Sequence, residues 1–156
     1  MRKYSVAVLA IISLFAGVGS QAADGDANKE AVVKDLQAFK GTWRLNSKEE
    51  DGKKFSEEEI KDVIMTNDGS GRASVRRGDK VIAEATVKLD PTTKPKTIDV
   101  TFTTGERKGK TALGIYEFEG DAFRVCIARP GDERPTEFSA KAGSGRTLIV
   151  YKRENK

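Results

Sequence analysis

The sequence predicts an all-β domain, most simply an up-and-down antiparallel β-barrel of about eight strands that follows one amphipathic helix. Three observations lead to this prediction. After Gly41, apolar and polar residues alternate in short runs, turn residues separate these runs roughly every 8 to 12 positions, and no second-domain linker interrupts the series. A closed sheet has no exposed edges, so we favour a barrel over the alternative fold, a β-sandwich.

The predicted helix covers residues 29–39, where Val32, Leu36 and Phe39 recur at helical spacing. Asn28 suits the N-cap, and Gly41 follows the C-terminal end.

A capping box at Ser56 to Glu59 predicts one further helical turn. The remaining alternating runs are expected to be strands, at residues 42–49, 63–66, 72–76, 81–89, 97–103, 111–119, 122–128, 137–140 and 146–153.

The hairpin around Gly120-Asp121 is specified most closely, because a two-residue loop fixes the register of its strands. The inward pairs are then Phe118 with Phe123, Tyr116 with Val125 and Gly114 with Ile127, and Glu117 lies opposite Arg124 on the outer face. Cys126 shares that outer face with apolar neighbours, so we expect the N-terminal helix to cover it as a buried thiol.

Composition excludes several kinds of chemistry. The chain has no His and one Cys, which removes imidazole-based catalysis, the common zinc sites and an internal disulfide. The spacing of the acidic residues matches neither a calcium loop nor a pair of glycosidase carboxylates. We therefore predict no enzyme, no catalytic residues, no metal and no cofactor.

The first residues are typical of a secretory signal peptide. Arg2 and Lys3 precede an apolar run from Val6 to Val18, and Ser20-Gln21-Ala22 has the small-x-small pattern of a cleavage site. We predict a signal peptide at 1–22, a flexible leader at 23–28 and a single domain at 29–156, exported to the periplasm or secreted, without stable membrane insertion.

Cleavage would remove Arg2 and Lys3 but no acidic residue, and would lower the formal net charge from +4 to +2. Such a small charge argues against nucleic acid as a partner. We expect a monomer.

Two sets of residues are candidates for binding. The inward residues of the middle strands either line a cavity for a small apolar ligand or fill a plain core; they are Phe102, Tyr116, Phe118, Phe123, Val125 and Ile127. Ala83, Ala85 and Gly114 leave room beside them. The second set lies in the rim loop 129–138, which contains Pro130 and Pro135, and would contact an exported protein partner; it consists of Arg129, Asp132, Glu133 and Arg134.

Gly41-Thr42-Trp43, after a helix and at the start of the first strand, resembles the Gly-x-Trp opening of lipocalins. In lipocalins a cation near the end of the last strand packs over this tryptophan, and Arg153 is the expected partner here, with Lys152 as the alternative. We expect Gly41, Trp43 and Arg153 to close one end of the barrel.

A wider resemblance covers nearly the whole chain after residue 22. The segments Leu89-Asp90-Pro91, Lys94-Pro95-Lys96-Thr97, Gly114-Ile115-Tyr116-Glu117 and Leu148-Ile149-Val150-Tyr151-Lys152-Arg153 are similar to a lipocalin-like domain that recurs in planctomycete exported proteins. This resemblance implies a fold and an extracytoplasmic setting but no activity. The sequence thus predicts an exported lipocalin-like binding module, with a protein-interaction or protease-inhibitor-like module acting through 129–138 as the alternative.

Overall fold

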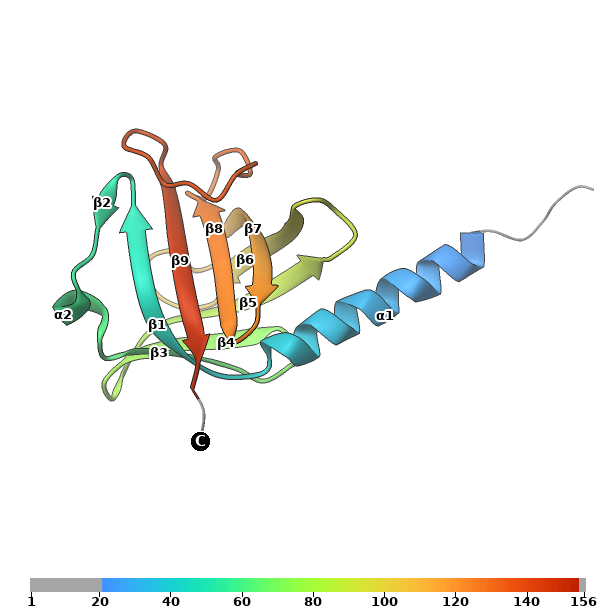
Figure 1. Cartoon of the computed structure of the whole chain (residues 1–156), viewed down its shortest axis with the longest axis horizontal. Coiled ribbons are helices and arrows are strands. Elements are labelled where there is room, and N and C mark those ends of the chain that lie inside the picture. The colour runs from blue at the N-terminus through green and yellow to red at the C-terminus, as the bar shows by residue number, and fades with distance from the viewer. Residues whose placement is uncertain (1–20, 155–156) are drawn as a thin grey trace, which may run out of the picture.

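The computed structural model describes residues 21–154, and the predicted signal peptide lies outside this range except for Gln21 and Ala22. The described chain is a closed barrel with a helix at one end (Figure 1). Its elements are α1 (Gln21–Phe39), β1 (Gly41–Glu50), β2 (Lys53–Lys54), α2 (Glu57–Ile60), β3 (Val63–Asn67), β4 (Arg72–Arg77), β5 (Lys80–Asp90), β6 (Lys96–Phe102), β7 (Thr111–Glu119), β8 (Ala122–Ala128) and β9 (Arg146–Arg153).

The sheet follows the order β2-β1-β3-β4-β5-β6-β7-β8-β9, and β1 also pairs with β9. Every pairing is antiparallel, so eight strands form the predicted up-and-down barrel and β2 is a short addition at its edge. The barrel prediction is therefore confirmed. Helix α1 lies at one end, and β2, α2 and the β4–β5 hairpin lie toward the other (Figure 1).

Helix α1 begins at Gln21, before the expected start at Lys29. It takes in residues 23–28, which the sequence analysis assigned to a flexible leader. Ala23 and Ala27 favour the helical state there despite Gly25. Residues 25–30 are exposed and extend away from the barrel (Figure 1).

Two strand predictions need correction. Residues 137–140 are not a strand, because Arg134 and Pro135 bind this segment to the outer wall of the barrel. In β5, alternation predicts that Val81 faces inward, but a bulge places Val81 opposite Arg76 while Ala83 lies opposite Val75. Ile82 is the extra residue, and it takes the inward position near the rim.

The β7–β8 hairpin has the predicted register in every pair, including Glu117 opposite Arg124, whose side chains form an ion pair at 2.9 Å. Gly114 does not leave free space as expected. A Cβ atom at Gly114 would lie 2.7 Å from both the Cys126 carbonyl oxygen and the Ile127 Cγ2 atom. Its missing side chain allows β7 and β8 to approach closely.

Trp43 closes the end of the barrel next to α1. Its side chain is fully buried, and its indole Nε1 donates a hydrogen bond to the Phe39 carbonyl oxygen at 2.8 Å. Arg153, which pairs with Trp43 across β1 and β9, stacks its guanidinium 4.1 Å from the indole ring. The same guanidinium donates to the carbonyl oxygens of Ala38 and Lys40.

Gly41 is required at this junction for two reasons. Its φ of +123° is a conformation that L side chains rarely adopt. A Cβ atom there would also lie 3.0 Å from Nη1 of Arg153.

A buried polar cluster is the second attachment of α1 to the barrel. Asp35 is almost fully buried, and its carboxylate accepts hydrogen bonds of 2.7 Å from Lys96 Nζ and from the Tyr116 hydroxyl. Both partners come from adjacent strands, β6 and β7. The cluster thus compensates the cost of burying the carboxylate.

Segment 129–145 covers the outer face of the hairpin, where the N-terminal helix was expected. Arg134 reaches between strands and donates to the carbonyl oxygens of Ile98 and Gly114 at 3.0 and 2.8 Å. Cys126 is fully buried beneath this segment, with its Sγ 3.5 Å from the Ser139 carbonyl oxygen. The thiol is buried as predicted. The prediction that the N-terminal helix covers it is wrong, because segment 129–145 does so.

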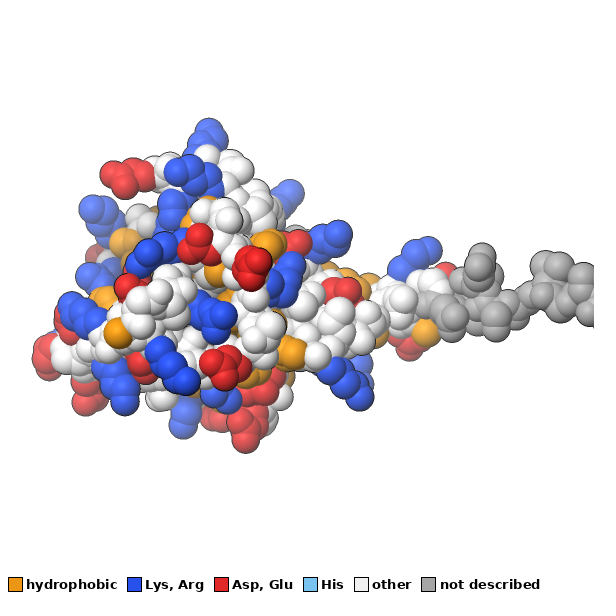
Figure 2. All heavy atoms as spheres, turned by 90° about the horizontal axis from the view of Figure 1, so that it is seen from above, with side chains coloured by type: hydrophobic (Ala, Val, Ile, Leu, Met, Phe, Trp, Pro, Cys, Tyr) orange, Lys and Arg blue, Asp and Glu red, His pale blue; other side chains and the backbone are white. Residues whose placement is uncertain are grey.

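Positive and negative side chains are interspersed over the face seen in Figure 2. Neither helix in residues 21–154 has the length and the hydropathy needed to cross a membrane.

Replacing Trp43 with Ala is expected to lower the free energy of unfolding by about 3 to 5 kcal/mol, because it empties a large buried volume and leaves Arg153 without its aromatic partner. Urea denaturation measures this loss. The exposed Lys152 is the matched control, and Lys152→Ala should change stability by less than about 0.5 kcal/mol. A loss below about 1 kcal/mol for Trp43→Ala would contradict this account of the closed end.

Tyr116 and Tyr151 are the two tyrosines that remain when residues 1–22 are removed, and both should stay neutral at a pH where a solvated tyrosine ionises. Burial raises the pKa of Tyr151 to about 12. Burial, and then the hydrogen bond to Asp35, raises the pKa of Tyr116 well above its usual range. Because an unfolded tyrosine ionises near pH 10, the stability from these neutral phenols is complete below about pH 10 and is lost as the pH rises through about 12.

Absorbance at 295 nm should therefore show no phenolate near pH 10 in the folded protein. Its rise should coincide with alkaline unfolding recorded by circular dichroism. Ionisation of one tyrosine near pH 10 in a still folded barrel would show that its ring is solvated.

Candidate functional site: the barrel cavity

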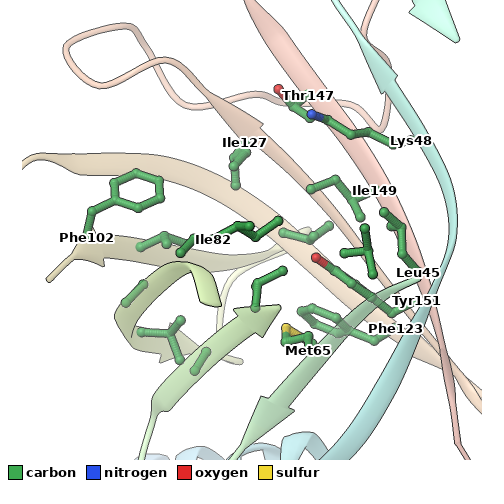
Figure 3. Close-up of a pocket in the computed structure, with 18 of the residues that line it drawn as sticks. Leu45, Lys48, Met65, Ile82, Phe102, Phe123, Ile127, Thr147, Ile149 and Tyr151 are labelled. Carbon is green, nitrogen blue, oxygen red and sulfur yellow. The ribbon is translucent and has the colours of Figure 1, made fainter. Parts of the chain in front are cut away.

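The barrel encloses a cavity of about 420 Å³ on the side of the aromatic floor away from α1. This volume lies within the usual range for small-molecule sites. Its walls are mostly aliphatic and aromatic, and its mouth is open to solvent. Figure 3 shows side chains from opposite walls pointing into this space; those labelled are Leu45, Lys48, Met65, Ile82, Phe102, Phe123, Ile127, Thr147, Ile149 and Tyr151.

The floor of the cavity is aromatic. The Phe123 ring lies 4.6 Å from the Phe39 ring, measured between centroids, and 6.4 Å from the Tyr151 ring, against which it stacks. Phe39 comes from the last turn of α1, so the helix end supplies part of the floor. The Tyr151 hydroxyl points into the cavity and gives this apolar surface one polar group (Figure 3).

Small residues leave the space open along one wall. Ala73 pairs with Ala85 across β4 and β5, and Ala83 lies one inward position closer to the mouth. A methyl group extends little from the sheet, so the larger side chains opposite do not fill the barrel. The alanines of β5 have the effect predicted from the sequence, whereas Gly114 contributes no lining.

Within residues 21–154, the mouth carries four of the five charged residues that line the cavity, and the fifth is Glu84 of β5. Lys48 and Glu50 come from β1 and form an ion pair at 2.8 Å. Arg77 ends β4, and Arg107 lies in the β6–β7 connection with its guanidinium 4.0 Å from the Phe102 ring. The cavity therefore has an apolar interior and a charged entrance.

The predicted cavity residues divide into two groups. Phe102, Phe123, Val125 and Ile127 line the cavity. Tyr116 and Phe118 do not: they lie in the aromatic cluster beneath the floor, in edge-to-face contact with 5.8 Å between ring centroids. The Tyr116 hydroxyl is used by Asp35, which draws this ring toward α1 and away from the cavity.

The residues of the predicted rim loop are also divided. Arg129 forms an ion pair with Asp51 at 3.3 Å, and Asp132 and Glu133 are exposed. Arg134 is directed into the wall, where it also forms an ion pair with Asp99 at 2.7 Å. This arginine joins the segment to the barrel.

Sequence reasoning missed the charged entrance. Ala73, Val75 and Arg77 are every second residue of β4 and so lie on the same face of the sheet. Extending this alternation to Arg77 would have predicted that it faces inward. Arg107 lies in a loop, where no periodicity applies. Ile82 reaches the lining only through the bulge.

The site offers binding groups and little acid–base chemistry. Within residues 21–154, no three His, Cys, Asp or Glu side chains gather as a metal site would require. Burial raises the pKa of the Cys126 thiol and so disfavours the reactive thiolate. Cys126 also lies outside the cavity, so it cannot act as a nucleophile there.

No protein-family model, curated protein or solved structure matches this chain. The cavity and its chemistry are therefore the basis on which a function is assigned.

Proposed function

We propose that the protein is an exported, non-enzymatic binding module of lipocalin-like type, and that it holds a small apolar ligand inside the barrel. The cavity of about 420 Å³, closed by the aromatic floor and open at one end, is the observation that carries this proposal. A ligand of this kind gains free energy by leaving water for the apolar walls. Export rests on the predicted signal peptide, and the lipocalin-like assignment rests on the resemblance around Trp43.

The alternative partner surface, the loop 129–138, has weaker support from the geometry. Arg134 directs its hydrogen bonds into the barrel wall, and Pro135 is fully buried. Arg129, Asp132 and Glu133 remain on the surface, and none of them lines the barrel cavity.

A neutral apolar probe should bind in the cavity. N-phenyl-1-naphthylamine is expected to gain fluorescence and to raise the melting temperature, since a ligand of the native state at 100 times its Kd adds about 2.7 kcal/mol of stability. Ala85→Phe should abolish both effects by filling the space. It should change the unfolding free energy by less than about 1.5 kcal/mol, because it occupies an existing void.

Thr86→Phe is the matched control, since Thr86 is the next residue of β5 and is exposed on the opposite face. It should leave probe binding unchanged. If Ala85→Phe destabilises the protein by several kcal/mol and no apolar probe shifts its melting, the interior is a filled core. The interaction module at 129–138 would then become the better proposal.

A further inference from the structure

We infer that the ligand is an amphiphile with an anionic head, carboxylate or phosphate, and that Arg77 and Arg107 hold this head at the mouth while the apolar tail occupies the cavity. This inference rests on the proposed function and names the class of ligand. It follows from the charges at the entrance.

The positive charge at the mouth is only partly balanced. Lys48 is neutralised by Glu50 at 2.8 Å, and the Lys48 ammonium also lies 4.3 Å from the Phe55 ring. Among the ion pairs within 4.0 Å in residues 21–154, none includes Arg77 or Arg107. Two guanidinium groups at the entrance are thus without a carboxylate.

Arg77 is directed into the barrel by the sheet. It pairs with Val63 across β3 and β4, and both residues line the cavity. Its Nη2 donates one hydrogen bond, to the Glu59 carbonyl oxygen at 3.1 Å. A guanidinium carries five N–H donors, so most of this group remains available to an anion at the mouth.

Arg107 reaches the same entrance from the β6–β7 connection. Its guanidinium lies 4.0 Å from the Phe102 ring, which is itself buried at the cavity wall. Contact with the ring face orients the guanidinium plane and leaves its N–H groups to point outward from its edges. Arginine in this state is well suited to carboxylate and phosphate oxygens.

The nearby carboxylate of Glu84 does not balance these cations. Glu84 is among the residues that line the cavity, but it lies between Ala83 and Ala85, which face inward, and it pairs with Ser74, with which it also borders a hollow outside the barrel. Successive side chains of a strand point to opposite faces, so this carboxylate is directed to the outer wall. The backbone carbonyl oxygen of Glu84 accepts a hydrogen bond from the Thr103 N–H at 2.9 Å.

The separation of charged and apolar groups also gives the ligand an orientation. The floor is formed by Phe123 and Tyr151, and its one polar group is a neutral phenol. A charged head placed there would lose its hydration without an opposite charge, whereas at the mouth it gains two cations and keeps some water. The tail therefore points toward α1 and the head toward solvent.

Four ligands with the same twelve-carbon tail test this inference: dodecanoate, dodecyl phosphate, dodecan-1-ol and dodecyltrimethylammonium. Their Kd values can be measured by displacement of N-phenyl-1-naphthylamine at pH 7.5, below the micelle concentrations. At least one of the two anions should bind roughly ten- to a hundredfold more tightly than the alcohol, as charge-assisted hydrogen bonds predict, and the ammonium compound should bind weakest. The two anionic arms identify which head is preferred.

Arg77→Gln and Arg107→Gln should each reduce the preference for the anion over the alcohol, and the double variant should remove it. Arg77→Lys, which keeps the charge, should retain part of it. Arg76→Gln and Lys108→Gln are the matched controls, because each is the exposed neighbour of one of these arginines and does not line the cavity. Thermal melting of each variant without ligand distinguishes loss of binding from loss of fold.

Equal affinity for anion and alcohol, or an anion preference that survives in the double variant, would overturn the inference and leave the apolar binding function intact. If the probe itself and all four ligands fail to bind, the proposed function is wrong and the inference with it.

Discussion

The guanidinium of Arg153 joins three parts of the chain that are far apart in sequence. It stacks on Trp43 at the start of the first barrel strand, it belongs to the last strand, and it donates to two carbonyl oxygens at the end of α1. Closure of the barrel and attachment of the helix are therefore one interaction. The Trp43 indole in turn donates to the Phe39 carbonyl oxygen and so holds Phe39 in place in the floor of the cavity.

Side-chain volume is distributed unevenly along the barrel axis, and the cavity results from this distribution. Phe39, Phe118 and Phe123 pack against one another at the closed end. Toward the mouth, β4 and β5 contribute alanines. Dense aromatic packing at one end stabilises the barrel enough for the other end to remain open, since apolar burial is the main favourable contribution to folding.

Local features were predictable from the sequence, and one distant contact, Arg153 on Trp43, was expected from the resemblance to lipocalins. Features that depend on other distant contacts were not predictable. The β7–β8 register follows from a two-residue turn and was predicted residue by residue. The bulge at Ile82 and the path of 129–145 depend on closure of the whole sheet and on Arg134 finding carbonyl oxygens in two other strands. For the same reason only part of the cavity wall was predicted correctly. Tyr116 was wrongly assigned to it, because its hydroxyl binds Asp35, which is 81 positions away in the sequence.

The exposed half of α1 also determines how the molecule can be presented to a surface. After removal of the predicted signal peptide, residues 23–30 rise about 1.5 Å each, so they hold their N-terminal end roughly 12 Å from the region where the helix meets the barrel. This end lies opposite the mouth, and the attachment at Asp35 and Phe39 keeps the helix in a defined direction. A tether at residue 23, the first that the predicted cleavage leaves, would therefore immobilise the protein with its entrance facing solution, and a dye placed there would report on rotation of the barrel without touching a bound molecule.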